Sequence, residues 1–278
     1  MSARGGRRVT DSRIWAQEVG EGPLVVLVHG AMDRSGGMLR VRRILQSSFR
    51  VVRYDRRGYA RSLAAGPPTS FDQQVDDLAG LLGGRPAVLA GHSFGGVICL
   101  ALAERQPGLV RSVLAFEAPK MWAPWWPGGT EGGRAVAIAG GVAGGPNGDD
   151  SDDEDGRAED AAEWFLRRMI GDAMWHRLPA SMRAERRAEG PTLVAELRSA
   201  RPPAPAPFEP SAITVPVLSA FGTETRPHHM RAAEELARSV PHGELRVVEG
   251  ATHGAHLSHP AEFADLVRRA FQLAGEAS

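Results

Sequence analysis

The sequence has one cysteine, one lysine and no long apolar run, and each shortage removes a class of protein. Cys99 alone can form neither an intramolecular disulfide nor a paired-cysteine metal or redox site. A catalytic lysine could only be Lys120. The 33 basic and 33 acidic residues balance, which does not favour nucleic acid or an anionic membrane as a partner. No run approaches the roughly 18 apolar residues of a membrane span, and no apolar stretch of signal length follows the N-terminus. We therefore expect a cytoplasmic protein.

Short apolar runs alternate with helical patterns, which predicts an α/β fold with a mostly parallel sheet flanked by helices. Near-continuous apolar strands indicate burial on both faces of the sheet. The predicted strands are Leu24–Val28, Arg50–Tyr54, Ala87–Ala90, Ser112–Phe116, Val215–Ala220 and Leu245–Val248, with an edge hairpin near 8–10 and 13–19. The predicted helices are Phe71–Leu82, Phe94–Arg105, His228–Val240 and Pro260–Leu273.

The alternating pattern breaks over residues 119–210, which predicts an inserted helical cap between two parts of one core, residues 1–118 and 211–278. Dense like charges repel, so the acidic run near 146–157 predicts a disordered loop. Helices are expected in the cap at 158–170, 173–188 and 192–200.

The segment Gly91-His92-Ser93-Phe94-Gly95 fits the pattern G-x-S-x-G between a predicted strand and a predicted helix. A strand that turns directly into a helix strains the backbone at the serine, and the two glycines let the chain pass close by. The turn lifts the Ser93 hydroxyl above the sheet, while the amides at the start of the helix can stabilise negative charge. Ser93 is therefore the candidate nucleophile.

Acyl transfer puts negative charge on the substrate carbonyl oxygen, which requires two preorganised hydrogen-bond donors. One expected donor is the backbone amide of Phe94, and the other is the amide of Ala31 in the loop after the first long strand. His29 is expected either to bond carbonyls of that loop or, with Met32, to line the substrate pocket.

A serine hydroxyl needs an adjacent base, and imidazole suits this task near neutral pH. Among His253, His256 and His259, only His253 directly follows the last predicted strand, so it is the candidate base. His228 and His229 form a local pair without an evident third ligand, so neither a metal nor another cofactor is expected.

In this order the segments VVLVHGAM, VVRYDRRGYARS, VLAGHSFGG and VVEGATHGAHLSHP resemble the α/β-hydrolase superfamily. The resemblance implies an eight-stranded sheet with the catalytic triad at the carboxyl ends of its strands. It also implies an acid after the penultimate strand, where this chain has Thr225. Some members, the haloalkane dehalogenases among them, place the acid after the preceding central strand, where Glu117 stands. The expected acid is Glu117, with Glu224 as the alternative. A serine nucleophile argues against dehalogenase chemistry, which uses aspartate.

The cap region carries several tryptophans, which either pack the cap or line an apolar pocket. The expected pocket residues are Trp122, Trp125 and Trp164. Such a pocket favours hydrolysis of an ester, lactone or thioester of a hydrophobic small molecule. The alternatives are a non-hydrolytic protein of the same fold, such as a cyclase, lyase or small-molecule binder, and a cofactor-free perhydrolase. The oligomeric state is not indicated.

Overall fold

The computed structural model describes residues 13–141 and 154–276, which form two compact units. Within these residues, the first unit contains 13–56, 74–120 and 207–276, and the second contains 57–73, 121–141 and 154–206. The second unit thus includes a short segment, 57–73, that precedes the predicted cap region. Among the described helices, none is long and apolar enough to cross a membrane.

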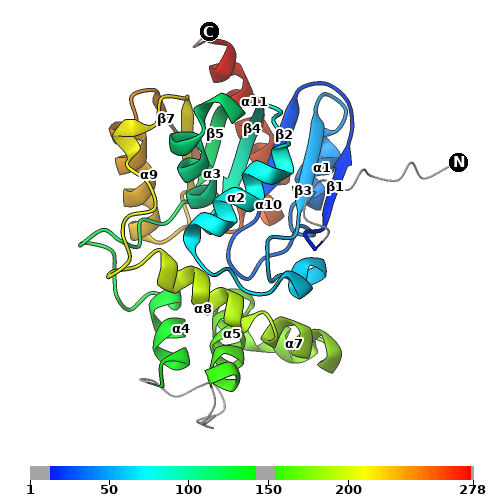
Figure 1. The fold of residues 1–278 in the computed structure, drawn as a ribbon, viewed down its shortest axis with the longest axis vertical. Coiled ribbons are helices and arrows are strands. Elements are labelled where there is room, and N and C mark those ends of the chain that lie inside the picture. The colour runs from blue at the N-terminus through cyan, green and yellow to red at the C-terminus, as the bar shows by residue number, and fades with distance from the viewer. Residues whose placement is uncertain (1–12, 142–153, 277–278) are drawn as a thin grey trace, which may run out of the picture. The chain divides into compact units, whose positions relative to one another are not determined.

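The first unit is built on a seven-stranded sheet within the described residues, with the strand order β1-β3-β2-β4-β5-β6-β7 (Figure 1). The strands are β1 (Ala16–Val19), β2 (Leu24–Val28), β3 (Arg50–Tyr54), β4 (Ala87–His92), β5 (Val110–Phe116), β6 (Val217–Gly222) and β7 (Gly243–Val248). All neighbouring pairs are parallel except β1 and β3. The α/β prediction is confirmed, including the bounds of β2 and β3.

Two details of the predicted sheet differ. Seven strands, rather than eight, are present in the described part of the chain. The expected hairpin also differs, because β1 pairs antiparallel with β3 rather than with a strand directly before it. The other half of that hairpin, residues 8–10, lies outside the described residues.

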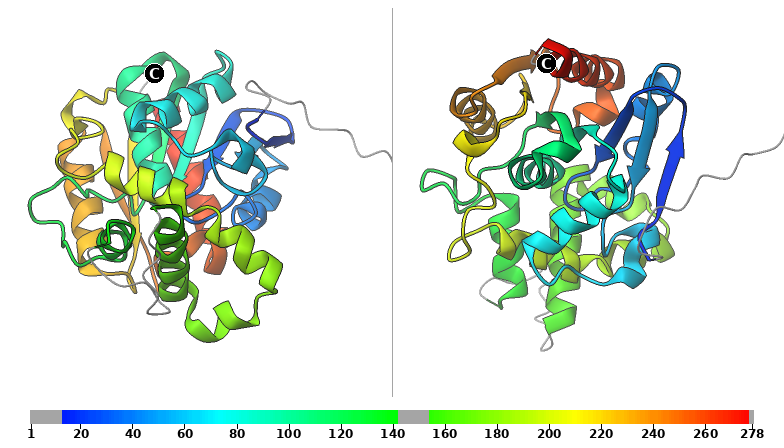
Figure 2. Two further views of the ribbon diagram at one scale, coloured as in Figure 1. Left: turned by 60° about the horizontal axis from the view of Figure 1, so that its bottom comes forward. Right: turned by 45° about the horizontal axis from the view of Figure 1, so that its top comes forward.

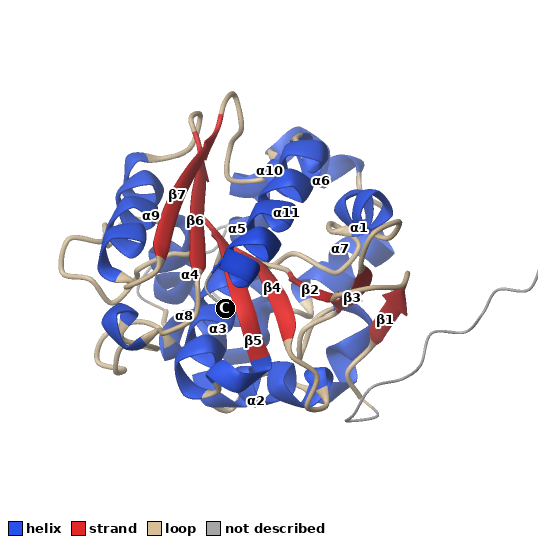
Figure 3. Cartoon of the chain, turned by 90° about the horizontal axis from the view of Figure 1, so that it is seen from above, coloured by secondary structure: helices blue, strands red, loops and turns tan. Residues whose placement is uncertain are grey.

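Helices cover both faces of the sheet, as the view from above shows (Figure 3). Helix α3 (Phe94–Arg105) packs on β4 and β5, and α9 (Pro227–Ser239) packs on β6 and β7. Helix α11 (Pro260–Glu276) packs on β4, β5 and β6, next to α1 (Leu39–Leu45). Helix α2 (Phe71–Leu82) has its predicted bounds, as α3 does. Apolar side chains of α1, α11 and the strands between them form a continuous buried core.

The second unit is helical, and its helices pack on one another (Figure 2). It contains the 3-10 helix η1 (Ala60–Ala65) and helices α4 (Glu131–Ala139), α5 (Glu154–Ile170), α6 (Asp172–Arg177), α7 (Ala180–Arg187) and α8 (Gly190–Ser199). The predicted helix 173–188 is two helices, because Leu178 is extended before Pro179, as a residue preceding proline prefers. Helix α4 was not predicted, since Gly132 and Gly133 in its first turn obscure its pattern.

The predicted acidic loop, 146–157, differs where it is described. Residues 142–153 lie outside the described part, whereas α5 begins at Glu154. Glu154 and Asp155 occupy the first turn of α5, where negative charge complements the positive end of the helix dipole. Acidity at that point therefore favours a helix start rather than a loop.

Candidate active site

Ser93 stands at the junction of β4 and α3, in a left-handed backbone conformation with φ 51° and ψ −125°. Side chains at the two neighbouring glycines would collide with the chain. A Cβ at Gly91 would lie 2.5 Å from Gly96 Cα, and one at Gly95 would meet the carbonyl oxygens of Val28 and His29. The sequence pattern therefore forms the strained turn that it predicts, with the serine partly exposed at the carboxyl edge of the sheet.

The loop after β2 packs directly against this turn. A Cβ at Gly30 would lie 3.0 Å from both His92 Nδ1 and Ser93 Cβ, which leaves room only for glycine. Ala31 and Met32 form a turn in which the Met32 φ is 51° and the Asp33 amide bonds Gly30 O at 3.4 Å. This turn and the first residue of α3 thus lie on two sides of Ser93, which is the arrangement that the two expected donors to one oxyanion require.

His29 lies beneath that turn and is fully buried. Its Nδ1–H donates to Gly30 O at 2.8 Å, and its Nε2 accepts from the Arg56 amide at 3.0 Å. Burial, with the nearby Arg56 charge next, lowers the pKa of His29 to about 4. Both ring nitrogens are engaged, which favours the structural role of His29 over the predicted place in the pocket wall. Met32, its predicted companion there, is also buried.

Arg56 is a buried residue that sequence reasoning did not single out. Its Nε donates to His29 O at 2.9 Å and its Nη2 to Gly30 O at 2.9 Å. Its guanidinium also lies 5.5 Å from the centroid of the Phe94 ring. One side chain therefore connects the loop that holds Ala31 with the residue that begins α3.

Glu117 follows β5 directly, is fully buried and has φ 49°. Its Oε2 accepts from His253 Nδ1 at 2.5 Å and from Thr225 Oγ1 at 2.7 Å, while its Oε1 accepts from the Gly222 amide at 3.0 Å. Thr225 occupies the position where the resemblance implies an acid. Its hydroxyl donates a hydrogen bond to the carboxylate of Glu117, which follows the neighbouring strand β5.

Glu224, the alternative acid, is exposed, and its amide donates to Ala251 O at 2.9 Å. Of the two carboxylates that the sequence left open, the structure brings Glu117 to the imidazole of His253.

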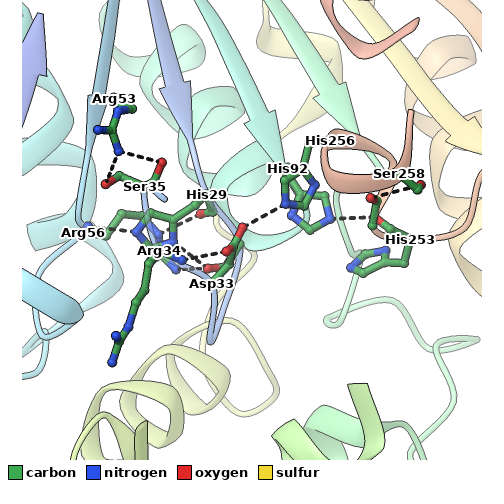
Figure 4. Close-up of polar contacts among 12 residues, drawn as sticks. His29, Asp33, Arg34, Ser35, Arg53, Arg56, His92, His253, His256 and Ser258 are labelled. Carbon is green, nitrogen blue, oxygen red and sulfur yellow. Dashed lines mark hydrogen bonds and ion pairs between the residues drawn. The ribbon is translucent and has the colours of Figure 1, made fainter. Parts of the chain in front are cut away.

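His253 lies in the loop between β7 and the short helix α10 (Ala255–Ser258), with its side chain 21% exposed. His92, the residue before Ser93, donates from Nε2 to His253 O at 2.8 Å, and the two ring centroids are 4.7 Å apart (Figure 4). Within residues 13–141 and 154–276, Ser93 Oγ makes no hydrogen bond to His253. Catalytic hydrogen bonds are often long in a free enzyme and tighten when substrate binds.

A second imidazole–carboxylate pair lies beside the first. His256 Nε2–H donates to Asp33 Oδ2 at 3.0 Å, and the His256 ring lies 4.2 Å from that of His92 (Figure 4). Burial alone would raise the pKa of Asp33, but the hydrogen bond from His256 and its charge hold it below the ordinary value. This pair ties the loop after β2 to α10. His256 is buried, while His259 bonds Ser258 Oγ at 2.8 Å.

Burial, followed by the charges of His256 and His253, lowers the pKa of His92 well below its ordinary value. His92 is therefore neutral near pH 7. Because its Nε2 faces a carbonyl oxygen, Nε2 carries the proton. The sequence carried a signal for this residue, since position 92 lies inside the G-x-S-x-G segment.

Among the residues that the structure describes, two groups of side chains lie close enough together to hold a metal ion. One is formed by Asp33, His92 and His256, and the other by Glu117, His229 and His253. The sequence predicted no metal site because His229 had no evident third ligand. In the structure, Glu117 and His253 come close to His229 from segments that are distant in the chain.

The predicted pocket tryptophans Trp122, Trp125 and Trp164 belong to the second unit and are half-buried there. Their role in substrate binding stays a prediction. Trp175 of the same unit is buried and donates from Nε1 to Glu163 Oε1 at 3.2 Å, which is a packing role.

The chain is similar to known proteins over most of the length described above. The sequence model of the alpha/beta hydrolase family matches residues 25–266. A 2-(acetamidomethylene)succinate hydrolase from Mesorhizobium japonicum is 35% identical over 118 residues, which is 40% of this chain and 42% of that protein. The match thus spans less than half the length of this relative.

Solved structures agree over nearly the whole chain. A thermophilic esterase from Thermogutta terrifontis superposes with a TM-score of 0.69 at 20% identity, covering 96% of this chain and 97% of that one. An enol-lactonase from Burkholderia xenovorans gives 0.68 at 22% identity, covering 93% and 96%. At such identities the likeness concerns the fold. Together with the family match over residues 25–266, it shows that the chain belongs to the alpha/beta hydrolase family.

Proposed function

We propose that the protein hydrolyses an ester, lactone or thioester of a hydrophobic small molecule through an acyl-Ser93 intermediate. The observation that carries the proposal is the hydrogen bond between His253 Nδ1 and Glu117 Oε2, next to a strained serine at the turn between β4 and α3. A buried carboxylate orients the imidazole and stabilises its charged form, which is what a general base beside a serine requires.

In the first half-reaction, His253 Nε2 takes the proton of Ser93 while Oγ attacks the substrate carbonyl carbon. The carbonyl oxygen becomes an oxyanion, which accepts hydrogen bonds from the amides of Phe94 and Ala31. When the intermediate collapses, His253 gives the proton to the leaving oxygen or sulfur, and the acyl group stays on Ser93. Glu117 stabilises the imidazolium throughout without taking its proton.

In the second half-reaction, a water molecule replaces the leaving group. His253 takes one of its protons as the water oxygen attacks the acyl carbon, and the same two amides stabilise the new oxyanion. Collapse breaks the bond to Ser93 Oγ, which regains its proton from His253. The products are a carboxylic acid and a free enzyme.

The test is covalent labelling of Ser93 by a fluorophosphonate, together with turnover of p-nitrophenyl esters. We expect stoichiometric labelling of the natural protein and none of Ser93→Ala, with turnover lost in parallel. Ser258→Ala, at an exposed serine near the same loop, is the matched control and should keep both activities. Undiminished labelling of Ser93→Ala would contradict the proposal.

A non-hydrolytic protein of this fold is the second candidate. It is favoured by one observation, the missing hydrogen bond between Ser93 and His253 in the described residues. It predicts intact binding of a hydrophobic ligand with little or no labelling of Ser93. Rapid labelling would exclude it.

A further inference from the structure

His229, on the first turn of α9, lies against the imidazole of His253. The two ring centroids are 4.5 Å apart, with an angle of 30° between the ring planes. The ring of the neighbouring His228 lies 4.5 Å from that of His229, with an angle of 43° between the ring planes. Its ring also hydrogen-bonds the backbone carbonyl of Glu117, so His229 lies beside both members of the Glu117–His253 pair, and no step of the proposed hydrolysis uses it.

Each of three side chains at this point offers a ligand atom to a common centre. The atoms of Glu117, His229 and His253 all lie within 4.8 Å of one another. In a tetrahedral zinc site, ligand atoms about 2.0–2.1 Å from the ion are about 3.3 Å from each other. The atoms that lie farthest apart therefore need to approach by at most about 1.5 Å. Glu117 Oε2 and His253 Nδ1, which are 2.5 Å apart, would have to separate by about 0.8 Å if Nδ1 is the ligand atom.

We propose that Glu117, His229 and His253 form a binding site for a divalent transition-metal ion of the Zn²⁺ class, and that an ion bound there inhibits the enzyme. Two histidines and one glutamate are a recurrent zinc donor set that leaves the fourth position open. The carboxylate is already held by the Gly222 amide and the Thr225 hydroxyl, so one ligand is fixed before the ion arrives. Such oriented carboxylates raise metal affinity.

The inhibition rests on the proposed function, whereas the binding does not. If the ion takes His253 Nε2, the base loses the lone pair that receives the Ser93 proton. If the ion takes Nδ1, the ring proton that was bonded to Glu117 sits on Nε2 instead, which then has no lone pair to receive the Ser93 proton. Either arrangement prevents general-base catalysis.

The test measures Zn²⁺ binding by calorimetry and the visible absorption of bound Co²⁺, which reports the coordination geometry without any substrate. We compare the natural protein with His229→Gln and with the matched control His228→Gln on the same helix turn. We expect one ion per chain, at least about tenfold weaker binding in His229→Gln, and an unchanged affinity in His228→Gln. Inhibition of ester turnover by Zn²⁺ should weaken by the same factor in His229→Gln.

A third variant assigns the site. Asp33→Asn removes a ligand of the neighbouring group that contains His92 and His256. Equal Zn²⁺ affinity in the natural protein and His229→Gln, loss of binding in Asp33→Asn alone, or no saturable binding at millimolar Zn²⁺ would each overturn the proposal. If the natural protein has no esterase activity, calorimetry and the Co²⁺ spectrum still decide whether the site exists.

Discussion

Ser93 and Glu117 both have a φ near +50°, a value that residues with a side chain rarely adopt. Of the four such non-glycine residues in the described chain, the other two are Met32 and Ala60, so three of the four border the candidate active site. A strained conformation persists only where the surrounding structure holds it. At Glu117 that structure includes the bond from its amide to Ala220 O at 2.8 Å, which aims the carboxylate at the loop of His253.

The acid at position 117 can be tested against its alternative. We expect Glu117→Gln to lower kcat by about 10³–10⁴-fold, because a neutral amide neither holds the productive tautomer nor stabilises the imidazolium. Glu224→Gln, which changes an exposed carboxylate, should leave kcat within about twofold. Steady-state turnover of a p-nitrophenyl ester measures both. The assignment fails if Glu224→Gln is the variant that loses activity.

At the scale of elements, the site depends on the close approach of two connections, the turn from β4 to α3 and the loop after β2. The two connections must approach closely if the proposed oxyanion donors, one in each connection, are to reach the same oxygen atom. Glycines at 30, 91 and 95 provide the space, and Arg56 bonds the carbonyls of the loop after β2. The same residues that shape the turn would therefore set the distance between Ser93 and the proposed donors.

Gly95→Ala tests this close approach. The added Cβ would press on the carbonyl oxygens of Val28 and His29, so we expect a loss of about 1–3 kcal/mol in the free energy of unfolding, as overpacking typically costs. Gly108→Ala is the matched control, since nothing lies within 4 Å of its added Cβ. We expect the control to be neutral or stabilising by less than about 1 kcal/mol. Urea denaturation compares the two, and equal stability of both variants would contradict the argument.

At the scale of the whole molecule, the first unit buries several imidazoles in neutral form around its candidate site. His29, His92 and His229 all have pKa values below the ordinary one, with burial as the largest cause. These histidines therefore bind a proton more readily in the unfolded chain. Their contribution to the free energy of unfolding is fully present above about pH 6.5 and is lost as the pH falls below that value.

Acid unfolding measures this effect. When the pH falls from 6.5 to 5, protonation of His29 alone should lower the free energy of unfolding by about 2 kcal/mol, because the pKa of His29 in the folded state is about 4. Asp33, whose pKa is lowered, acts only below about pH 4, so this window reports on histidines. Urea titrations at the two pH values give the difference, and His176→Gln, at an exposed histidine, should leave it unchanged. A free energy of unfolding that is constant across the window would refute the prediction.

The sequence by itself determined the α/β class, the bounds of β2, β3, α2 and α3, and the strained serine turn. These features depend on apolar periodicity and on a local glycine pattern. Both signals can be recognised within a short segment without knowledge of the rest of the chain. Sequence reasoning also favoured Glu117 as the acid over Glu224, but it left Glu224 open as an alternative, because both residues follow strands that end at the same edge.

Only the tertiary structure decided which carboxylate meets His253, because that choice depends on the direction of each side chain at its strand end. The same holds for the Asp33–His256 pair and for the approach of His229 to His253, which join residues 223 and 24 positions apart. Such contacts arise from the order of strands and the packing of helices, and no local pattern in the chain records them.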